Sequence, residues 1–126
     1  MQVIRIVPNV ASEDFAASRE FYSALFDLEV SVELDGWYLQ LKDGSDPLLN
    51  LGLLEPASEL TAGRDDAARP AGVVVTVHVD DVDEAYARAV RVGAEIATDL
   101  RDEEYGQRRF LVVDPNGLLV NVMSPR

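Results

Sequence analysis

The chain has 126 residues, of which 48% are hydrophobic, and its 11 Lys and Arg against 23 Asp and Glu give a formal net charge of -12. This length is sufficient for one domain with one hydrophobic core. No apolar stretch approaches the roughly 20 residues of a membrane-spanning helix, and so few cationic residues cannot form the basic face that phosphate backbones require. We therefore expect neither a membrane nor nucleic acid as a partner.

The first ten residues have no basic segment followed by an apolar core and a cleavage site, so a signal peptide is not expected. The chain contains no Cys, which excludes disulfides and thiolate metal sites. We expect a cytoplasmic protein. The acidic balance either serves solubility alone or favours a cationic small molecule.

The first half of the chain is predicted to contain a strand, a helix and three further strands. An extended apolar segment ends at Val10, and Asp14 is expected to cap the helix. Apolar and small residues then recur at helical spacing: Phe15, Ser18, Tyr22 and Leu25. Alternating runs predict the three strands at residues 28–33, 37–42 and 48–53.

A segment rich in Ala, Pro, Gly and charge, residues 55–70, predicts a linker. The plan of the first half is then repeated, with Asp81 as the cap of a second helix and Gly93 at its end. Its expected buried stripe is Val82, Ala85, Ala89 and Val92. Three strands are predicted at residues 95–98, 108–113 and 118–123. The chain is therefore expected to be one α+β domain of two βαβββ modules, residues 1–54 and 71–126.

Strand alternation assigns each strand residue to one face of its sheet. The face toward the helix is expected to be apolar: Ile4, Ile6, Val10, Leu49, Leu51, Leu53, Val73, Val75, Val77, Val79, Leu118, Val120 and Val122. The opposite face is mixed in polarity: Arg5, Val7, Asn9, Leu48, Asn50, Val74, Thr76, His78, Leu119, Asn121 and Met123. Asn50 and Asn121 stand at the same distance after Asp43 and Asp114, and they are expected to occupy equivalent places.

Three stretches resemble the vicinal oxygen chelate superfamily, which includes glyoxalases, extradiol dioxygenases, fosfomycin-inactivating enzymes and bleomycin-binding resistance proteins. They are "DFAASREFYSALF", similar to its first helix, "VHVDDVDEAYARAVRVGAEI", similar to its second strand-helix unit, and "DPNGLLVNVMSP", similar to its closing hairpin. The resemblance covers nearly the whole chain. It implies paired βαβββ modules whose curled mixed sheets surround a cavity.

Metal-dependent members of this superfamily carry ligands on the first and last strand of each module. The matching positions in this chain are Val7, Asn50, Val74 and Asn121. Valine has no donor atom, and an amide oxygen is a weak neutral ligand beside imidazole or carboxylate. We therefore expect no bound metal and no other cofactor.

The residues expected to line the cavity are Trp37, Tyr38, Gln40, Asn50, Thr76, His78, Arg109 and Asn121. Aromatic rings stack against planar or cationic compounds. The two Asn amides could bond a ligand or each other, and Arg5 and Arg109 could pair with an anionic ligand or with carboxylates of the chain. An acidic rim is expected from Glu29, Glu33, Asp35, Asp102, Glu103 and Glu104.

These features, with the resemblance, predict a homodimeric, metal-independent protein that binds a small organic molecule, with a cationic aromatic compound as one class. Sequestration of the bleomycin-resistance type is the expected role, and no catalytic residue is assigned. A lyase, isomerase or dioxygenase relative that uses His78 or Tyr38 is the alternative. A module that acts through a protein partner, without a ligand of its own, is a second alternative.

Overall fold

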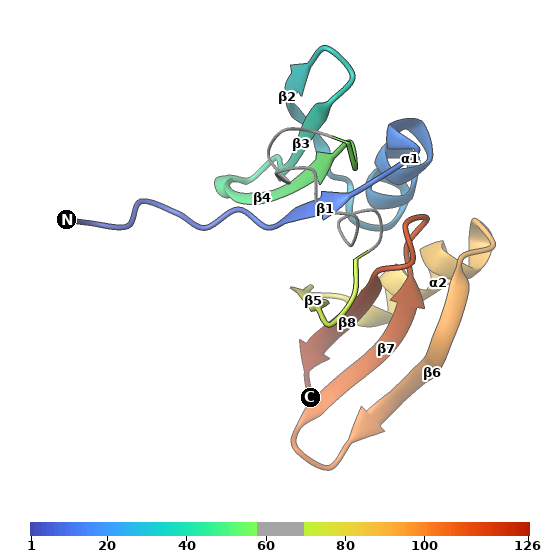
Figure 1. Cartoon of the computed structure of the whole chain (residues 1–126). Coiled ribbons are helices and arrows are strands. Elements are labelled where there is room, and N and C mark those ends of the chain that lie inside the picture. Colours follow the sequence, from blue (N-terminus) through green and yellow to red (C-terminus); the bar gives the residue numbers. More distant parts are fainter. Residues whose placement is uncertain (58–69) are drawn as a thin grey trace. The chain divides into compact units, whose positions relative to one another are not determined.

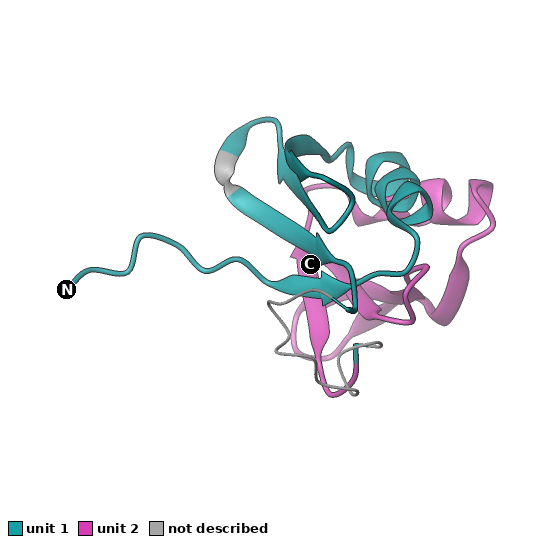
Figure 2. Ribbon diagram, turned by 45° about the horizontal axis from the view of Figure 1, so that its top comes forward, with its two compact units in different colours: residues 1–70 teal, residues 71–126 magenta. Residues whose placement is uncertain are grey.

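The computed structural model describes residues 1–57 and 70–126. The chain divides into two compact units, Met1–Pro70 and Ala71–Arg126, which Figure 2 distinguishes by colour. Each unit contains one helix and one four-stranded mixed sheet (Figure 1). The predicted α+β class is therefore confirmed. Most of the predicted linker lies outside the described residues, and within the described ranges no helix is long and apolar enough to cross a membrane.

Unit 1 has the predicted order of strand, helix and three strands. Its elements are β1 (Asn9–Ala11), α1 (Phe15–Phe26), β2 (Glu29–Leu34), β3 (Tyr38–Asp43) and β4 (Asp46–Leu54). The strand order in the sheet is β1-β4-β3-β2, with β1 parallel to β4 and the other pairs antiparallel. β1 and β2 are thus the two edges of this sheet.

Helix α1 begins where the sequence predicts. The carboxylate of Asp14 accepts a hydrogen bond from the backbone N–H of Ala17 at 3.0 Å, which satisfies one of the free donors at the helix start. Phe21, Tyr22 and Leu25 are buried, and the helix packs against β2 and β3. The apolar stripe therefore forms the core of this unit, together with the buried leucines of β3 and β4.

The first eight residues do not form the predicted start of the opening strand. They run as an extended arm away from β1 (Figure 1), and Ile4 and Ile6 are 77% and 84% exposed instead of covering α1. Pro8 explains the boundary, because it lacks a backbone N–H and restricts the residue before it. The prediction for Leu49 is also wrong, since that side chain is exposed near the start of β4.

Unit 2 repeats the order of unit 1. It contains β5 (Val74–His78), α2 (Val82–Arg91), β6 (Glu95–Glu103), β7 (Gln107–Val113) and β8 (Leu119–Pro125). Its sheet has the order β5-β8-β7-β6, again with one parallel pair, β5 with β8. β6 is much longer than the predicted strand, and its pairing with β7 contains two register shifts. Such irregularities break the simple alternation on which a sequence prediction depends.

Helix α2 is capped by Asp81, whose carboxylate accepts from the backbone N–H of Glu84 at 3.0 Å. Gly93 has a φ of 71° and ends the helix in the left-handed region, as its sequence position predicts. Val82, Ala85 and Ala89 are buried. Val92 is exposed, so its assignment to the buried stripe is wrong, because the helix has already ended at Arg91. Val73, which precedes β5, is exposed as well.

The strand registers correct the expected equivalence of Asn50 and Asn121. Asn9 and Thr76 stand at the same distance before the capping residues of their helices, and they are therefore equivalent. In the parallel pairs, Asn9 lies beside Gly52, whereas Thr76 lies beside Asn121. The counterpart of Asn121 is therefore Gly52, and Asn50 lies at the next same-face position of β4.

Candidate functional site

A set of hydrogen-bonded polar side chains crosses three strands of unit 1. We call this set the polar row of unit 1: Asn9, Tyr38, Gln40 and Asn50. The hydroxyl of Tyr38 lies 2.8 Å from Oε1 of Gln40 and 3.1 Å from Oδ1 of Asn9. Gln40 Nε2 donates to Oδ1 of Asn50 at 2.9 Å. The structure thus brings together three of the predicted site residues. It adds Asn9, which was not among the residues predicted to line the cavity.

The polar row is on the sheet face opposite the core. Tyr38 and Gln40 alternate along β3 with Leu39 and Leu41, which are buried. Gln40 is itself only 6% exposed, so its amide has little access to solvent. A buried amide must satisfy its hydrogen-bonding groups within the protein. Tyr38 donates to Oε1 of Gln40, and Nε2 of Gln40 donates to Asn50, so both the oxygen and the nitrogen of the amide have a partner.

Gly52 makes the contact between Asn9 and Tyr38 possible. It lies on β4, between β1, which carries Asn9, and β3, which carries Tyr38. A Cβ added at Gly52 would collide with Oδ1 of Asn9 and would lie 2.7 Å from the hydroxyl of Tyr38. The missing side chain therefore provides the space in which two side chains meet across the intervening strand.

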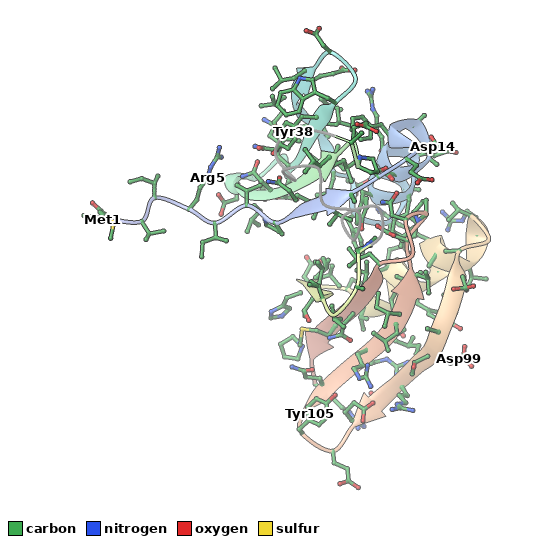
Figure 3. All side chains as sticks on the ribbon, in the orientation of Figure 1. Met1, Arg5, Asp14, Tyr38, Asp99 and Tyr105 are labelled. Carbon is green, nitrogen blue, oxygen red and sulfur yellow. The ribbon has the colours of Figure 1, made fainter. Side chains whose placement is uncertain are left out.

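The hydroxyl of Tyr38 is held in its neutral form. Burial raises the pKa of Tyr38 above its ordinary value, and the positive charge of Arg5 opposes part of that rise. Tyr38 is therefore a hydrogen-bond donor at neutral pH and a poor proton acceptor. Arg5 is exposed on the N-terminal arm (Figure 3). It makes no ion pair among the described residues. The expectation that Arg5 pairs with a carboxylate of the chain is therefore not met within those residues.

Trp37 lies beside the polar row, in the tight turn between β2 and β3. The N–H of Trp37 donates to the carbonyl of Leu34 at 2.9 Å, and Asp35 and Gly36 both have positive φ, as a hairpin turn of this kind requires. The ring centroids of Trp37 and Tyr38 are 5.8 Å apart, with an angle of 39° between the planes. Trp37 is 37% exposed, so part of the indole is accessible to a ligand.

Unit 2 carries a different polar set, which we call the charged row of unit 2: Thr76, Arg101, Glu103, Arg109 and Asn121. Asn121 Nδ2 donates to Oγ1 of Thr76 at 3.3 Å, and Arg109 Nη1 approaches Oδ1 of Asn121 at 3.4 Å. Oε1 of Glu103 accepts from Nε of Arg109 at 3.1 Å and from Nε of Arg101 at 2.6 Å. Arg109 therefore pairs with a carboxylate of the chain, Glu103, which was one of the two expectations for it.

Glu103 is the anion at the centre of this row. The hydrogen bond from Arg101, together with the charges of Arg101 and Arg109, lowers the pKa of the Glu103 carboxyl below its ordinary value despite an opposing effect of burial. Other parts of the expected acidic rim are paired as well. Glu29 lies 3.8 Å from Lys42, and Asp102 pairs with Arg108 at 3.1 Å. Much of the expected rim charge is thus balanced within each unit.

His78 does not join the charged row. It is exposed on β5, and its side chain makes no hydrogen bond to any residue that the structure describes. Met123, paired with His78 in the register of β5 and β8, is buried. A general base in an active site is commonly oriented by a hydrogen-bonded partner. The geometry around His78 therefore gives no support to a role as a general base.

The four positions that the resemblance assigns to metal ligands do not fit a divalent ion. Val7 and Val74 have no donor atom, and Val7 lies outside β1. The side-chain oxygen of Asn50 accepts from Gln40, while that of Asn121 faces the guanidinium of Arg109, whose charge would repel a cation. Within residues 1–57 and 70–126, no group of three His, Asp or Glu side chains is arranged to hold a metal.

Residues 4–122 match the family described as the Glyoxalase/Bleomycin resistance protein/Dioxygenase superfamily. The chain belongs to this superfamily, in agreement with the resemblance found in the sequence. An uncharacterized protein of Mycobacterium bovis is 26% identical over 126 residues, a match that covers 87% of this chain and 76% of the relative.

Two solved structures show the same fold at low sequence identity. TnmS3, an antibiotic binding protein from Streptomyces sp. CB03234, has a TM-score of 0.78 and 18% identity, with coverage of 100% of this chain and 99% of that one. Lactoylglutathione lyase from Agrobacterium tumefaciens has a TM-score of 0.75 and 21% identity, with coverage of 98% and 94%. The fold is therefore shared by a protein that binds an antibiotic and by an enzyme.

Proposed function

We propose that this protein binds a small organic molecule without a metal, and that sequestration of an antibiotic-like compound is its role. The observation that carries the proposal is the polar row of unit 1 beside Trp37. Neutral amide and phenol groups are held in place by one another, next to an accessible indole. Ligand sites typically combine aromatic surface with a few positioned polar groups.

The residues at the four positions assigned by the resemblance support metal independence. Two aliphatic side chains and two amides that are engaged in hydrogen bonds offer no anionic donor. Similarity of fold to TnmS3 supports binding as the class of activity, since that structure is described as an antibiotic binding protein. The fold alone does not decide between binding and catalysis. His78 has no hydrogen-bonded partner among the described residues, and this supports binding.

A cationic aromatic compound is the first class of ligand to test. Glu33 precedes the turn that leads to Trp37 and Asp35 lies within it, and neither makes an ion pair among the described residues. Their charges are part of the overall charge of -12. A cation over an indole or phenol ring gains roughly 0.5–1 kcal/mol at an exposed site. Long-range attraction from the carboxylates would add to this and would weaken as salt is added.

We also propose that the protein acts as a homodimer. The N-terminal arm exposes four large apolar side chains, Met1, Val3, Ile4 and Ile6, and it leads directly into the edge strand β1. Exposed strand edges and clustered apolar side chains are usually covered in a soluble protein. A second copy of the chain offers the same surfaces in symmetric form.

The proposal is tested by titration of Trp37 fluorescence, because Trp37 is the only tryptophan. The probes are 1-naphthylmethylamine, which is cationic, and 1-naphthylmethanol, which is neutral. We expect saturable quenching by the amine that weakens between low and moderate salt. The variant Trp37→Phe controls for the optical signal, with calorimetry as a second readout. Failure of both compounds, and of a wider aromatic library in a thermal-shift screen, would contradict the proposal.

A further inference from the structure

The hydroxyl of Tyr38 lies within hydrogen-bonding distance of two acceptor oxygens, Oε1 of Gln40 and Oδ1 of Asn9. A phenol has one proton and donates to one acceptor at a time. The amide of Gln40 is oriented by its other contact, because its Nε2 donates to Asn50. Its Oε1 therefore faces Tyr38 as the nearer acceptor, at 2.8 Å against 3.1 Å for Asn9. Tyr38 therefore donates its phenol proton to Gln40, and no proton lies between Oη of Tyr38 and Oδ1 of Asn9.

Two oxygen atoms with lone pairs are thus held 3.1 Å apart, Oη of Tyr38 and Oδ1 of Asn9. If the amide of Asn9 turns over, its Nδ2 donates to Tyr38 and its carbonyl oxygen becomes an acceptor that points away from the phenol. In both arrangements Oδ1 of Asn9 accepts no hydrogen bond within the polar row and can accept one from a ligand. Asn9 is exposed and Tyr38 is partly exposed, so a donor from a ligand can reach them.

We infer that the polar row of unit 1 selects ligands that carry an N–H donor, with Oδ1 of Asn9 as the principal acceptor and Oη of Tyr38 beside it. This inference rests on the proposed function and specifies the ligand that the site takes. It assigns Asn9 as a ligand-binding residue. Because the rings of Tyr38 and Trp37 lie next to each other, the donor is expected on an aromatic ligand.

A protonated amine meets this requirement best, because a hydrogen bond from a charged donor is shorter and stronger than a neutral one. A quaternary ammonium ion has the same charge and no N–H. The two therefore separate hydrogen bonding from electrostatic attraction. Arg5, whose charge acts on Tyr38, repels both cations alike, so its effect cancels in the comparison.

The experiment compares 1-naphthylmethylamine with its N,N,N-trimethyl analogue by isothermal titration calorimetry at pH 7. We expect the amine to bind the wild-type protein about tenfold more tightly, the ratio that one additional hydrogen bond provides. Asn9→Leu and Tyr38→Phe should each remove most of this preference, and Tyr38→Phe retains the ring. Gln2→Leu is the matched control, since Gln2 is an exposed amide on the same arm and its loss should leave the preference intact.

The outcomes separate this inference from the proposed function. Equal affinities of the two probes for the wild-type protein overturn the donor requirement, while binding of an aromatic compound stands. A preference that survives in both Asn9→Leu and Tyr38→Phe overturns the assignment of Asn9 and Tyr38. Absence of binding by either probe counts against the proposed function as well.

Discussion

Asn9 and Tyr38 meet above Gly52, across the full width of strand β4. The contact joins the edge strand β1 to β3, which are not neighbours in the sheet. Gly52 is not among the glycines with positive φ, so its backbone conformation is open to other residues. Its role is steric, because only hydrogen leaves the space in which the two side chains meet.

Replacement of Gly52 by Ala should therefore force the side chains of Asn9 and Tyr38 apart. We expect a loss of about 1–3 kcal/mol in the free energy of unfolding, from the steric collision and the displacement of the two side chains. Gly44→Ala is the matched control in the same unit, since its Cβ would meet only the flexible end of Glu29, at 3.2 Å. Urea denaturation measures both, and equal stabilities of the two variants would contradict the steric role.

The stability of unit 2 should depend on pH through Glu103. Arg101 and Arg109 hold the folded-state pKa of this carboxyl below the ordinary value of 4.5. A lowered carboxyl pKa contributes stability that is fully present above pH 4.5 and is lost as the pH falls through the folded-state value. Glu103→Gln should be less stable at neutral pH and should lose less stability on acidification. Urea unfolding from pH 7 to pH 3 tests this.

The control for that series is Glu104→Gln, because Glu104 is exposed and has no ion pair among the described residues. It should keep the acid dependence of the wild-type protein. The same dependence in Glu103→Gln would show that the paired carboxylate does not contribute to acid sensitivity.

Helix α2 should depend on its cap. Asp81→Ala removes the acceptor for the N–H of Glu84 and is expected to lower the free energy of unfolding by about 1 kcal/mol. Asp81→Asn should preserve most of that stability, since Asn caps helices nearly as well. Asp80→Ala, next in sequence and exposed, is the control and should change stability by less than about 0.5 kcal/mol. Thermal unfolding followed by circular dichroism distinguishes the three variants.

The protein should bind no divalent metal ion at micromolar or tighter affinity. Dialysis against trace zinc, nickel and manganese, followed by elemental analysis, checks this expectation. One ion per chain would refute it. The positive control replaces Val7 and Val74 by His and Asn50 and Asn121 by Glu, which supplies the donor types of the metal-dependent members. If this variant also fails to bind metal, the assignment of the four positions is in doubt.

Sedimentation should show a homodimer at tens of micromolar concentration. The double variant Ile4→Lys and Ile6→Lys should shift it toward monomer, because charge on the apolar arm opposes burial against a second copy. Val90→Lys is the control, as Val90 is an exposed apolar residue on α2. A monomeric wild-type protein would contradict the homodimer. A dimer that the double variant leaves unchanged would show that the arm is not part of the interface.

Local sequence signals predicted the helices and the order of helices and strands along the chain. Asp14 and Asp81 cap their helices as expected because capping depends on side chains within one turn. The repeat of strand, helix and three strands also survives in the fold, since each module has its own sheet. The bounds of β6 were missed because its register shifts depend on β7, which no local pattern encodes.

Most members of the polar row of unit 1 were among the residues predicted to line the cavity. Tyr38, Gln40 and Asn50 were selected, and they are hydrogen-bonded to one another. Asn9 was assigned to the correct face, but its contact with Tyr38 depends on the pairing of β1 with β4 and on the missing side chain of Gly52. A glycine inside an apolar strand was the available signal, because such a residue often marks a close approach. Whether the two modules enclose a shared cavity stays a prediction.

The register of the closing strands separates the chemistry of the two halves. Where unit 1 has Gly52, unit 2 has Asn121, so neutral amides and a phenol meet in one half and guanidinium groups with a carboxylate in the other. The two units therefore share one architecture and carry different chemical groups at equivalent places. A ligand group that suits the neutral polar row of unit 1 is therefore not expected to suit the charged row of unit 2.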